Sequence, residues 1–557
     1  MGRAGLHPAR AGRPPGRRNS LTGWLDASEL RIGLGCMRLA EEQAFETVAA
    51  AAAAGITVFD TARAYAGNEP LVAQALRRCG AEDRARIVTK GGMAAGWVPD
   101  GRAKTIRADC EGSLVALDGV PIDVYLVHAP DPRTPWRTTV RALARLVDDG
   151  LVRRVGLSNV NRPQLDEALD LAPVAAVEVA LSPFDDHALR GGIVERCEEL
   201  GISVIAHSPL GGPRRAHRIS AEAALAWLLE LSPVVVPIPG ARRPETVRSA
   251  ARAATLELDD GQRSAFGAPR PARRAAAEAG EIVVVMGVPG AGKSRVAAAY
   301  AERGFLRLNR DERSGTLRAL AAALDEELAA GARRIVLDNT YLTRASRSYV
   351  LDAAARHGLR ARCIWVDVPL AQAQVNLVER LLDRFGRLPT PEELRSAARE
   401  PGMLTPTSQM RTFRDLEPPA PDEGFTEIER RPFVRESRAR ARTAVFVAAG
   451  AVELAVGAGD AAAPHLVYHW DPDGAGDALD AAVVRLSTAV SGPVEGALCP
   501  HAAGPPRCWC RPPLPGLPLA FARAHDVDVA GSLVVGTGAA HRTLANALGA
   551  LYVGPAA

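Results

Sequence analysis

Short apolar runs alternate with helical stretches along the first half of the chain. Residues 29–268 hold runs such as ITVFD (56–60), RIVTK (86–90) and DVYLVHA (123–129), separated by helical patterns such as EEQAFETVAAAAAAG. Repetition of strand and helix at this spacing predicts a parallel sheet covered by helices. About eight such units in roughly 240 residues predict a compact (β/α)8 barrel.

The pattern changes after residue 268. The stretch GAPRPARRAAAEAGE has no apolar period and predicts a linker at 269–280. Further strand-like runs then extend to about residue 435, and AVFVAAG opens another segment at Thr443. We therefore predict an α/β chain of three domains at 29–268, 281–435 and 440–557, preceded by a disordered basic arm at 1–28.

Length, composition and charge narrow the class of protein. The 557 residues exceed what one core can organise, and 47% apolar with 24% charged residues is ordinary for a soluble protein. The formal net charge of +4 gives no strong case for a large nucleic-acid surface. We find no secretory signal and no membrane-spanning run, and most of the 8 cysteines are scattered, so a cytoplasmic protein without membrane contact is expected.

The segment EIVVVMGVPGAGKS (281–294) carries the most specific motif. A buried strand runs into a glycine loop and then into a helix, which is the context of a nucleotide-binding P-loop. Three glycines, Gly287, Gly290 and Gly292, let backbone N–H groups approach phosphate oxygens. Lys293 can reach the β- and γ-phosphates of ATP, and Ser294 can hold Mg²⁺.

Four polar side chains follow strand ends in the first region. VFDTARAY supplies Asp60 and Tyr65, VTKGG supplies Lys90 and YLVHAPD supplies His128. The region resembles the aldo-keto reductase family, whose Asp-Tyr-Lys-His tetrad these residues match. The resemblance implies that Tyr65 donates a proton to a small carbonyl substrate while Lys90, held by Asp60, lowers the cost of the phenolate. His128 would orient the carbonyl or assist proton transfer.

The same resemblance implies an NADPH site with several departures. Ser158 and Asn159 in GLSNV stand where the family contacts the nicotinamide amide, and Glu178 stands where it usually has Gln. His207 replaces the tyrosine that stacks on nicotinamide. Arg242 and Arg243 lie near the expected position of the adenosine 2′-phosphate, which favours NADPH over NADH. The family's Glu-Asn after this motif is Ser249-Ala250 here.

Two motifs downstream of the P-loop indicate the phosphate acceptor. FLRLNRDERSG places Asp311 after one strand, and RRIVLDNTYLT places Asp338 after the next. With the P-loop and the segment FRDLEPPAPDEGFTEI, they resemble the 5′-hydroxyl polynucleotide kinase family. That resemblance implies Asp311 as general base, Asp338 near Mg²⁺ or the acceptor, and a nucleic-acid 5′ end, RNA or DNA, as partner. Arg313 and Arg380 are candidates for phosphate contacts, with a solvated helix face as the alternative for Arg380.

The third segment contains a metal-ligand pattern. Three cysteines, Cys499, Cys508 and Cys510, and His501 fall within twelve positions. Three thiolates and one imidazole form a tetrahedral set for structural Zn²⁺. The stretch resembles the zinc loop of haloacid dehalogenase phosphatases that act on heptose bisphosphate and histidinol phosphate.

The carboxylates of that phosphatase family are missing. After the strand AVFV, where the family has its Asp nucleophile and a second Asp, the chain reads Ala448-Ala449-Gly450. Without those carboxylates there is neither a nucleophile nor an Mg²⁺ cradle. We therefore expect an inactive phosphatase-like domain that keeps its zinc and serves binding, positioning or dimerisation.

Together these patterns predict an NADPH-dependent reductase, an ATP-dependent polynucleotide kinase and a zinc-bearing pseudo-phosphatase in one chain, with a homodimer left open. Two alternatives also stay open. The kinase and the reductase could act on one small metabolite, or the barrel could sense NADPH without turnover, as the substitutions at Glu178, His207 and Ser249 would suggest.

Overall fold

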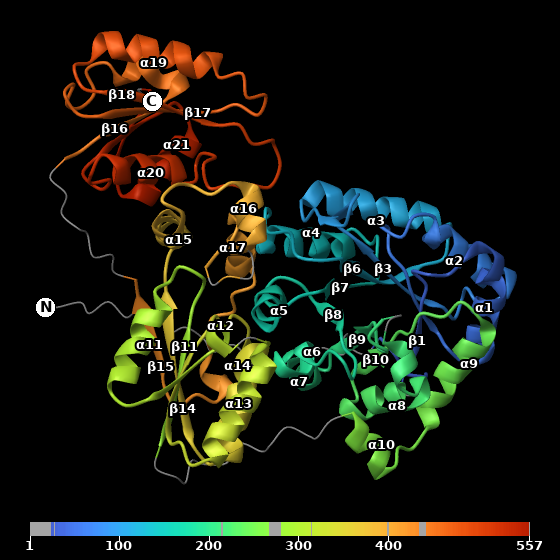
Figure 1. The fold of residues 1–557 in the computed structure, drawn as a ribbon. Coiled ribbons are helices and arrows are strands. Elements are labelled where there is room, and N and C mark those ends of the chain that lie inside the picture. The colour runs from blue at the N-terminus through green and yellow to red at the C-terminus, as the bar shows by residue number, and fades with distance from the viewer. Residues whose placement is uncertain are drawn as a thin grey trace, which may run out of the picture. The chain divides into compact units, whose positions relative to one another are not determined.

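The computed structural model describes residues 24–26, 28–212, 215–266, 280–313, 315–397, 400, 402–433 and 442–555. The chain forms two compact units, residues 1–269 and 270–557, coloured blue to green and yellow to red in Figure 1. Nearly all of the arm predicted at 1–28 and of the linker predicted at 269–280 lies outside the described residues. Within the described ranges, every helix is too short or too polar to cross a lipid bilayer.

The first unit is a closed barrel of eight parallel strands. Their order is β1-β2-β3-β6-β7-β8-β9-β10. The bounds are β1 Gly33–Gly35, β2 Val58–Asp60, β3 Arg86–Gly91, β6 Ile122–Val127, β7 Arg154–Ser158, β8 Val174–Ala180, β9 Ser203–His207 and β10 Val235–Pro237. A bridge between Gly35 and Gly240 joins the first strand to the last and confirms the predicted barrel. A Cβ on Gly35 would lie 2.8 Å from the carbonyl oxygen of Ile238, so a side chain there would push the closing strands apart.

Helices surround the barrel, as Figure 1 shows. They are α1 Glu41–Ala53, α2 Asn68–Arg78, α3 Ala103–Leu117, α4 Trp136–Asp148, α5 Arg162–Leu169, α6 His187–Arg190, α7 Ile193–Leu200, α8 Ala221–Leu231, α9 Pro244–Arg252 and α10 Asp260–Ala265. In α4 the buried residues Val140, Leu143 and Leu146 recur at helical spacing and face the strands. A short hairpin of β4 (Met93–Ala94) and β5 (Val98–Pro99) follows β3.

The second unit begins with a parallel sheet ordered β12-β13-β11-β14-β15. Its strands are β11 Glu281–Met286, β12 Leu306–Asn309, β13 Arg334–Asp338, β14 Arg360–Asp367 and β15 Ile428–Pro432. The helices that accompany it are α11 Lys293–Glu302, α12 Arg310–Arg313, α13 Leu317–Ala329, α14 Arg344–Arg356, α15 Leu370–Phe385, α16 Pro391–Ser396 and α17 Pro406–Arg414. The P-loop strand β11 is central, so its apolar run is buried on both faces.

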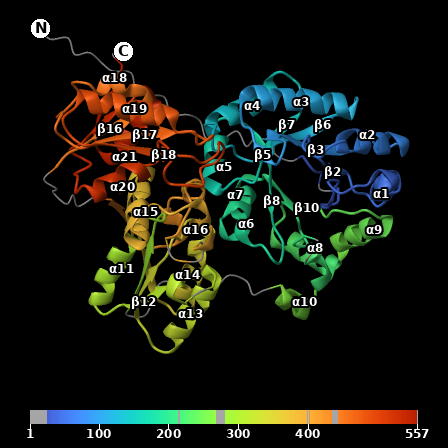
Figure 2. The same ribbon diagram turned by 45° about the horizontal axis from the view of Figure 1, so that its top comes forward.

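A further parallel sheet, ordered β18-β17-β16-β19-β20, ends the chain. Its strands are β16 Val445–Ala448, β17 His465–Trp470, β18 Val494–Cys499, β19 Leu533–Val535 and β20 Leu551–Val553. The helices are α18 Val452–Ala455, α19 Asp477–Ala489, α20 Gly516–Ala524 and α21 Ala539–Leu548. Helix α15 packs on α20 and α21, and both ribbon views place it between the two sheets (Figures 1 and 2). The boundary predicted between 435 and 440 thus lies inside one compact unit.

A buried ion pair ties α14 to the segment that precedes β15. The side chain of Arg347 is fully buried, and its Nη2 and Nε donate to the Glu423 carboxylate over 2.6 and 2.7 Å. Its Nη1 also donates to the carbonyl oxygens of Tyr341 (3.0 Å) and Glu417 (2.9 Å). A buried charge is tolerated where its partner and its hydrogen bonds are complete, as they are here.

Removal of one partner should therefore destabilise the second unit strongly. We expect Arg347→Met to lower its free energy of unfolding by about 3–5 kcal/mol, because Glu423 would be left buried and unpaired. Calorimetry of the full chain should show an earlier transition for this unit only. Adding Glu423→Leu should recover part of the loss, and a transition unchanged in Arg347→Met would contradict the assigned role.

Candidate functional site

A buried lysine lies at the centre of the barrel site. Lys90, in β3, is fully buried, and its Nζ lies 2.5 Å from Asp60 Oδ1 at the end of β2. The same nitrogen lies 3.0 Å from Glu178 Oε2 of β8 and donates to the carbonyl oxygen of Thr61 over 3.0 Å. Two neighbouring strands, β2 and β3, and the more distant strand β8 thus bring charged side chains to one ammonium, at the edge where barrel enzymes build their sites.

The charges in this cluster shift one another's pKa. Burial disfavours the Lys90 ammonium, but the two carboxylates outweigh burial and hold the pKa of Lys90 above its usual value. Burial, and then the Glu178 carboxylate, raise the pKa of Asp60 to about 8, while Lys90 opposes the rise. Asp60 therefore holds its proton to higher pH than an ordinary carboxyl, while Lys90 keeps its charge.

Tyr65 and His128 stand beside this cluster. Lys90 Nζ lies 5.5 Å from the centroid of the Tyr65 ring, and the rings of Tyr65 and His128 are 5.8 Å apart in an edge-on arrangement. Burial raises the pKa of Tyr65, and Lys90 opposes that rise. Burial and the charge of Lys90 lower the pKa of His128 to about 4, so its imidazole is neutral at pH 7. The structure thus brings together all four residues of the tetrad.

An indole that the sequence analysis missed completes this group. Trp97 lies between the strands of the β4–β5 hairpin, 54% exposed, with its ring centroid 6.1 Å from Tyr65 and 5.8 Å from His128. The signal available in the sequence was a large aromatic residue in a loop that follows a barrel strand. Trp97 therefore lines the space in which a molecule bound to Tyr65 would lie.

The residues expected to hold the cofactor line a cavity of about 680 Å³ together with Asp60, Tyr65 and His128. Asn159 donates to the carbonyl oxygen of His128 over 3.0 Å, and its Oδ1 lies 3.3 Å from His207 Nε2. Ser158 is fully buried behind it and accepts from the Asn159 amide over 3.1 Å. Glu178 also reaches the cavity, although its carboxylate is engaged by Lys90.

The cavity suits a dinucleotide with phosphate groups. Arg242 and Arg243 are exposed at its rim, where α9 begins, and a helix N-terminus adds favourable positive potential for phosphate. Toward the barrel, His128 Nδ1 is buried and has no hydrogen-bond partner within the described part of the chain. The Ser249 hydroxyl instead donates to Glu222 of α8 over 2.8 Å, so this proton is not offered to a phosphate group.

In the second unit the helices α15 and α17 pack against the glycine loop. Gly290 has φ +87°, and a Cβ there would lie 2.5 Å from the carbonyl oxygen of Ala373 in α15, so only glycine fits. Asn376 donates to the Gly290 oxygen over 2.7 Å, and Gln409 of α17 donates to the Pro289 oxygen over 3.2 Å. Gly287 and Gly292 also have positive φ, and Ser294 is exposed in the first turn of α11.

Lys293 sits among charges of both signs. Its Nζ donates to the carbonyl oxygen of Val288 over 3.0 Å. Burial lowers its pKa to about 8, Asp338 and Asp311 oppose that change, and Arg380 and Arg310 add to it. Asp311 therefore lies within electrostatic reach of the P-loop lysine.

Two residues that the sequence analysis did not single out hold these carboxylates. Arg307 Nη2 and Asn309 Nδ2 donate to Asp338 Oδ2 over 2.6 and 3.1 Å. Asn309 Oδ1 in turn accepts the backbone N–H of Asp311 over 2.7 Å. Arg313, a candidate phosphate contact, forms an ion pair with Glu327 of α13 at 3.0 Å. The only signal in the sequence was that Arg307 and Asn309 alternate with leucines at the end of an apolar, strand-like run.

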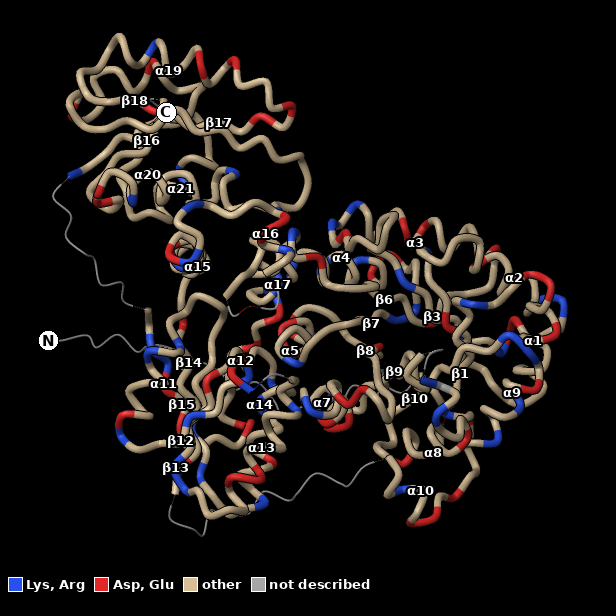
Figure 3. The backbone as a smooth tube through the Cα atoms, in the orientation of Figure 1, with Lys and Arg blue, Asp and Glu red and all other residues tan. Residues whose placement is uncertain are grey.

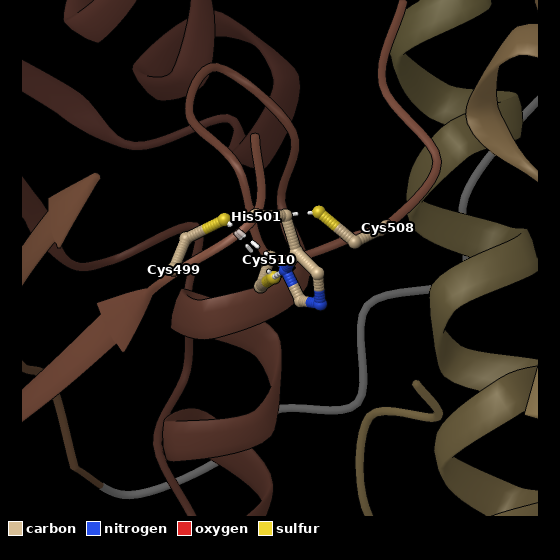
Figure 4. Close-up of side chains that lie close together, drawn as sticks. All are labelled: Cys499, His501, Cys508 and Cys510. Carbon is tan, nitrogen blue, oxygen red and sulfur yellow. Dashed lines mark hydrogen bonds between the residues drawn. The ribbon is translucent and has the colours of Figure 1, made fainter. Parts of the chain in front are cut away.

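The Cys/His pattern in the last segment converges to one point (Figure 4). Cys499 ends β18, and its Sγ lies 3.7 Å from that of Cys508 and 3.2 Å from that of Cys510. His501 Nδ1 lies 3.2 Å from Cys510 Sγ and 3.6 Å from Cys499 Sγ. A tetrahedral ion with metal–sulfur bonds of about 2.3 Å separates its ligands by about 3.7 Å, so these side chains fit zinc.

The carboxyl edge of the last sheet lacks acidic side chains where strands β16 and β19 end. Residues Ala449 and Ala451 after β16 are buried, and Thr537 after β19 donates its N–H to His541 Nδ1 over 3.1 Å. A histidine thus fills part of the edge at which parallel α/β folds usually bind ligands.

Family models match two parts of the chain. The model described as "Aldo/keto reductase family" matches residues 31–218, and the model described as "AAA domain" matches residues 282–399. The first match spans the strands that carry Asp60, Lys90, His128 and Glu178. The second begins at the P-loop strand and ends beyond α16, so it includes Lys293 and Asp338.

Individual relatives align with the barrel. Aldo-keto reductase 1 of Glycine max is 31% identical over 266 residues, which are 38% of this chain and 76% of the relative. Aldo-keto reductase str7 of Strobilurus tenacellus is 35% identical over 173 residues, 31% of this chain and 51% of the relative. A solved aldo/keto reductase of Klebsiella pneumoniae, in complex with NADP and acetate, is 27% identical with a TM-score of 0.38, covering 42% of this chain and 89% of that one. Through its N-terminal barrel, the chain belongs to the aldo-keto reductase family.

Proposed function

We propose that the barrel is an NADPH-dependent reductase of small carbonyl compounds. The observation that carries this proposal is the buried ammonium of Lys90 between Asp60 and Glu178, next to the Tyr65 phenol. NADPH, held along Asn159, His207 and the rim of Arg242 and Arg243, would supply hydride to the carbonyl carbon. Tyr65 donates its proton to the carbonyl oxygen, and Lys90 stabilises the phenolate that forms.

The other residues of the site orient the reacting groups and keep water away from them. His128, neutral at pH 7, can still donate a hydrogen bond to the carbonyl oxygen through its one ring N–H. Trp97 covers Tyr65 and restricts access of water. Asp60 and Glu178 keep Lys90 charged and in place.

We further propose that the P-loop domain transfers the γ-phosphate of ATP, with Mg²⁺, to the 5′-hydroxyl of a polynucleotide. Support comes from the placement of Asp311, backed by Asn309, within electrostatic reach of Lys293. Asp311 would accept the hydroxyl proton, Lys293 and Arg380 would balance the phosphate charge, and Asp338 would help to hold Mg²⁺ or contact the acceptor. Basic and acidic residues are interspersed along the second unit (Figure 3), so the same site also suits a small-molecule acceptor.

The last segment, in this proposal, is a zinc-bearing phosphatase-like domain of the haloacid dehalogenase type without phosphatase activity. Zinc at Cys499, His501, Cys508 and Cys510 fits their spacing and chemistry. The missing carboxylates at Ala449 and Thr537 leave no nucleophile at the sheet edge.

Replacing the proposed acid tests the reductase. We expect Tyr65→Phe to lower aldehyde-dependent oxidation of NADPH by about 10²–10⁴-fold while NADPH affinity stays within about twofold. Tyr125→Phe, the same change at a buried tyrosine outside the cavity, should retain activity. Turnover retained in Tyr65→Phe would rule out its role, and tight NADPH binding without any turnover in the unaltered protein would favour the sensor alternative.

The carboxyl groups of Asp60 and Glu178 predict that the reductase activity depends on pH. Above about pH 8 Asp60 loses its proton, and the added negative charge makes Tyr65 a weaker acid, so kcat/KM should fall as pH rises through about 8. Glu178→Gln removes one carboxylate and should lower the pKa of Asp60. The decline in kcat/KM should therefore move to lower pH than in the unaltered protein. Glu69→Gln, a buried carboxylate bonded to Thr89, is the control. Superimposable profiles for Glu178→Gln and the unaltered protein would refute this account.

Phosphate transfer should be measured with labelled ATP and 5′-hydroxyl DNA and RNA oligonucleotides, against a panel of sugars and alcohols. We expect Asp311→Asn to lower transfer by about 10²-fold or more with ATP affinity kept, because only the proton acceptor is lost. Asp325→Asn, which removes a carboxylate that pairs with Arg356, should change little. Transfer to small molecules alone would replace the nucleic-acid acceptor, and no transfer at all would contradict the kinase.

A further inference from the structure

The helices above the P-loop form a segment that touches the glycine loop directly. We call residues 370–397 and 402–414, which include α15, α16 and α17, the lid segment. Asn376 and Gln409 donate to the carbonyl oxygens of Gly290 and Pro289. Arg380, also on α15, contributes to the charge around Lys293. The position of the lid segment therefore sets the shape of the nucleotide loop.

The opposite side of the lid segment is buried in the last sheet. Buried apolar residues of α15 and α16 share one core with α20, α21 and the strands β16, β17 and β19. These lid residues are Val375, Leu377, Val378, Leu381, Leu382 and Leu394. Two polar contacts accompany the core: Gln372 donates to the Ala547 oxygen over 3.2 Å, and Arg523 pairs with Asp383 at 2.5 Å.

The loop that carries the metal ligands is the third contact of the lid segment. Trp509, between two of the cysteines, is 1% exposed and donates its Nε1–H to the Leu404 oxygen over 2.9 Å. Thr407, at the start of α17, donates to the Pro506 oxygen over 2.7 Å. Leu388, just after α15, packs against the three cysteines themselves.

This loop has little backbone structure of its own. Residues 500–515 contain no helix or strand, and the loop is rich in proline. Contacts made by side chains therefore matter for its shape. Arg511 donates to the carbonyl oxygens of Ala502 and Gly504, and Cys499, His501, Cys508 and Cys510 gather the two ends of the loop at one point. A bound ion would fix Trp509 and Pro506 at the positions where Leu404 and Thr407 meet them.

We propose that metal binding at this cluster positions the lid segment and thereby sets the nucleotide affinity of the P-loop. The ligand chemistry is a thiolate-preferring divalent ion such as Zn²⁺. The proposal rests on nucleotide binding by the P-loop, and it gives the last sheet a positioning role toward the kinase site. The link runs from the metal loop through Trp509 and Thr407 to α17 and from there to the loop at Pro289.

The test uses the full chain and a fluorescent ATP analogue, mant-ATP, with Mg²⁺ added after the chelator has been removed by gel filtration. We expect zinc depletion to weaken mant-ATP binding at least tenfold and zinc addition to restore it. Cys508→Ser should show the weak binding without restoration. NADPH binding by the barrel, measured in the same samples, should stay within twofold and report that the chain remains folded.

Two variants that keep all four metal ligands test the proposal even if Cys508→Ser misfolds. Thr407→Val and Trp509→Phe remove one hydrogen bond each between the metal loop and the lid segment, and we expect three- to tenfold weaker mant-ATP binding with zinc content unchanged. Hydrogen exchange of the lid segment should rise in both. Thr412→Val is the matched control, because Thr412 donates only to Gln409 of its own helix.

The outcomes separate the two proposals. Equal mant-ATP affinity with and without zinc, in protein that binds the analogue, overturns the coupling and leaves the P-loop assignment intact. Zinc-loaded protein that does not bind mant-ATP at all overturns both. Binding that falls with depletion but not in Thr407→Val or Trp509→Phe overturns the route through these contacts.

Discussion

One constraint shapes every site in this chain: parallel strands bring their carboxyl ends to the same edge. All three large sheets are parallel, so each strand returns through a helix and each strand end becomes a place for a polar side chain. Asp60, Lys90 and Glu178 meet because β2, β3 and β8 end together. Asn309 and Asp338 meet for the same reason, since β12 and β13 pair in register at these two residues.

The sequence predicted what depends on local motifs. The tetrad of Asp60, Tyr65, Lys90 and His128 extends over 68 positions and could be predicted only because its short motifs match those of the aldo-keto reductase family. The barrel and the glycine loop before Lys293 depend on residue types at short, regular spacing, and the structure places them as expected. The cysteine pattern is of the same kind, because a loop of twelve residues can close only in a few ways. In these cases chain connectivity itself brings the groups together.

What the sequence could not show depends on contacts between distant segments. Glu178 could be expected near the cofactor, but its ion pair with Lys90 joins residues 88 positions apart, and this distance along the chain hides the effect of Glu178 on the pKa of Asp60. The Arg347–Glu423 pair and the Trp509–Leu404 hydrogen bond are of this long-range type as well. Arg313 shows the opposite case, since a charged residue beside a motif pairs with its neighbour Glu327 on the next helix.

The common core of the lid segment and the last sheet has an evolutionary consequence. Deletion of the last segment would leave the apolar side of α15 facing water and would remove the partners of Leu381 and Leu382. Selection on the P-loop sheet would therefore also act against mutations that truncate the last segment, whatever chemistry that segment performs.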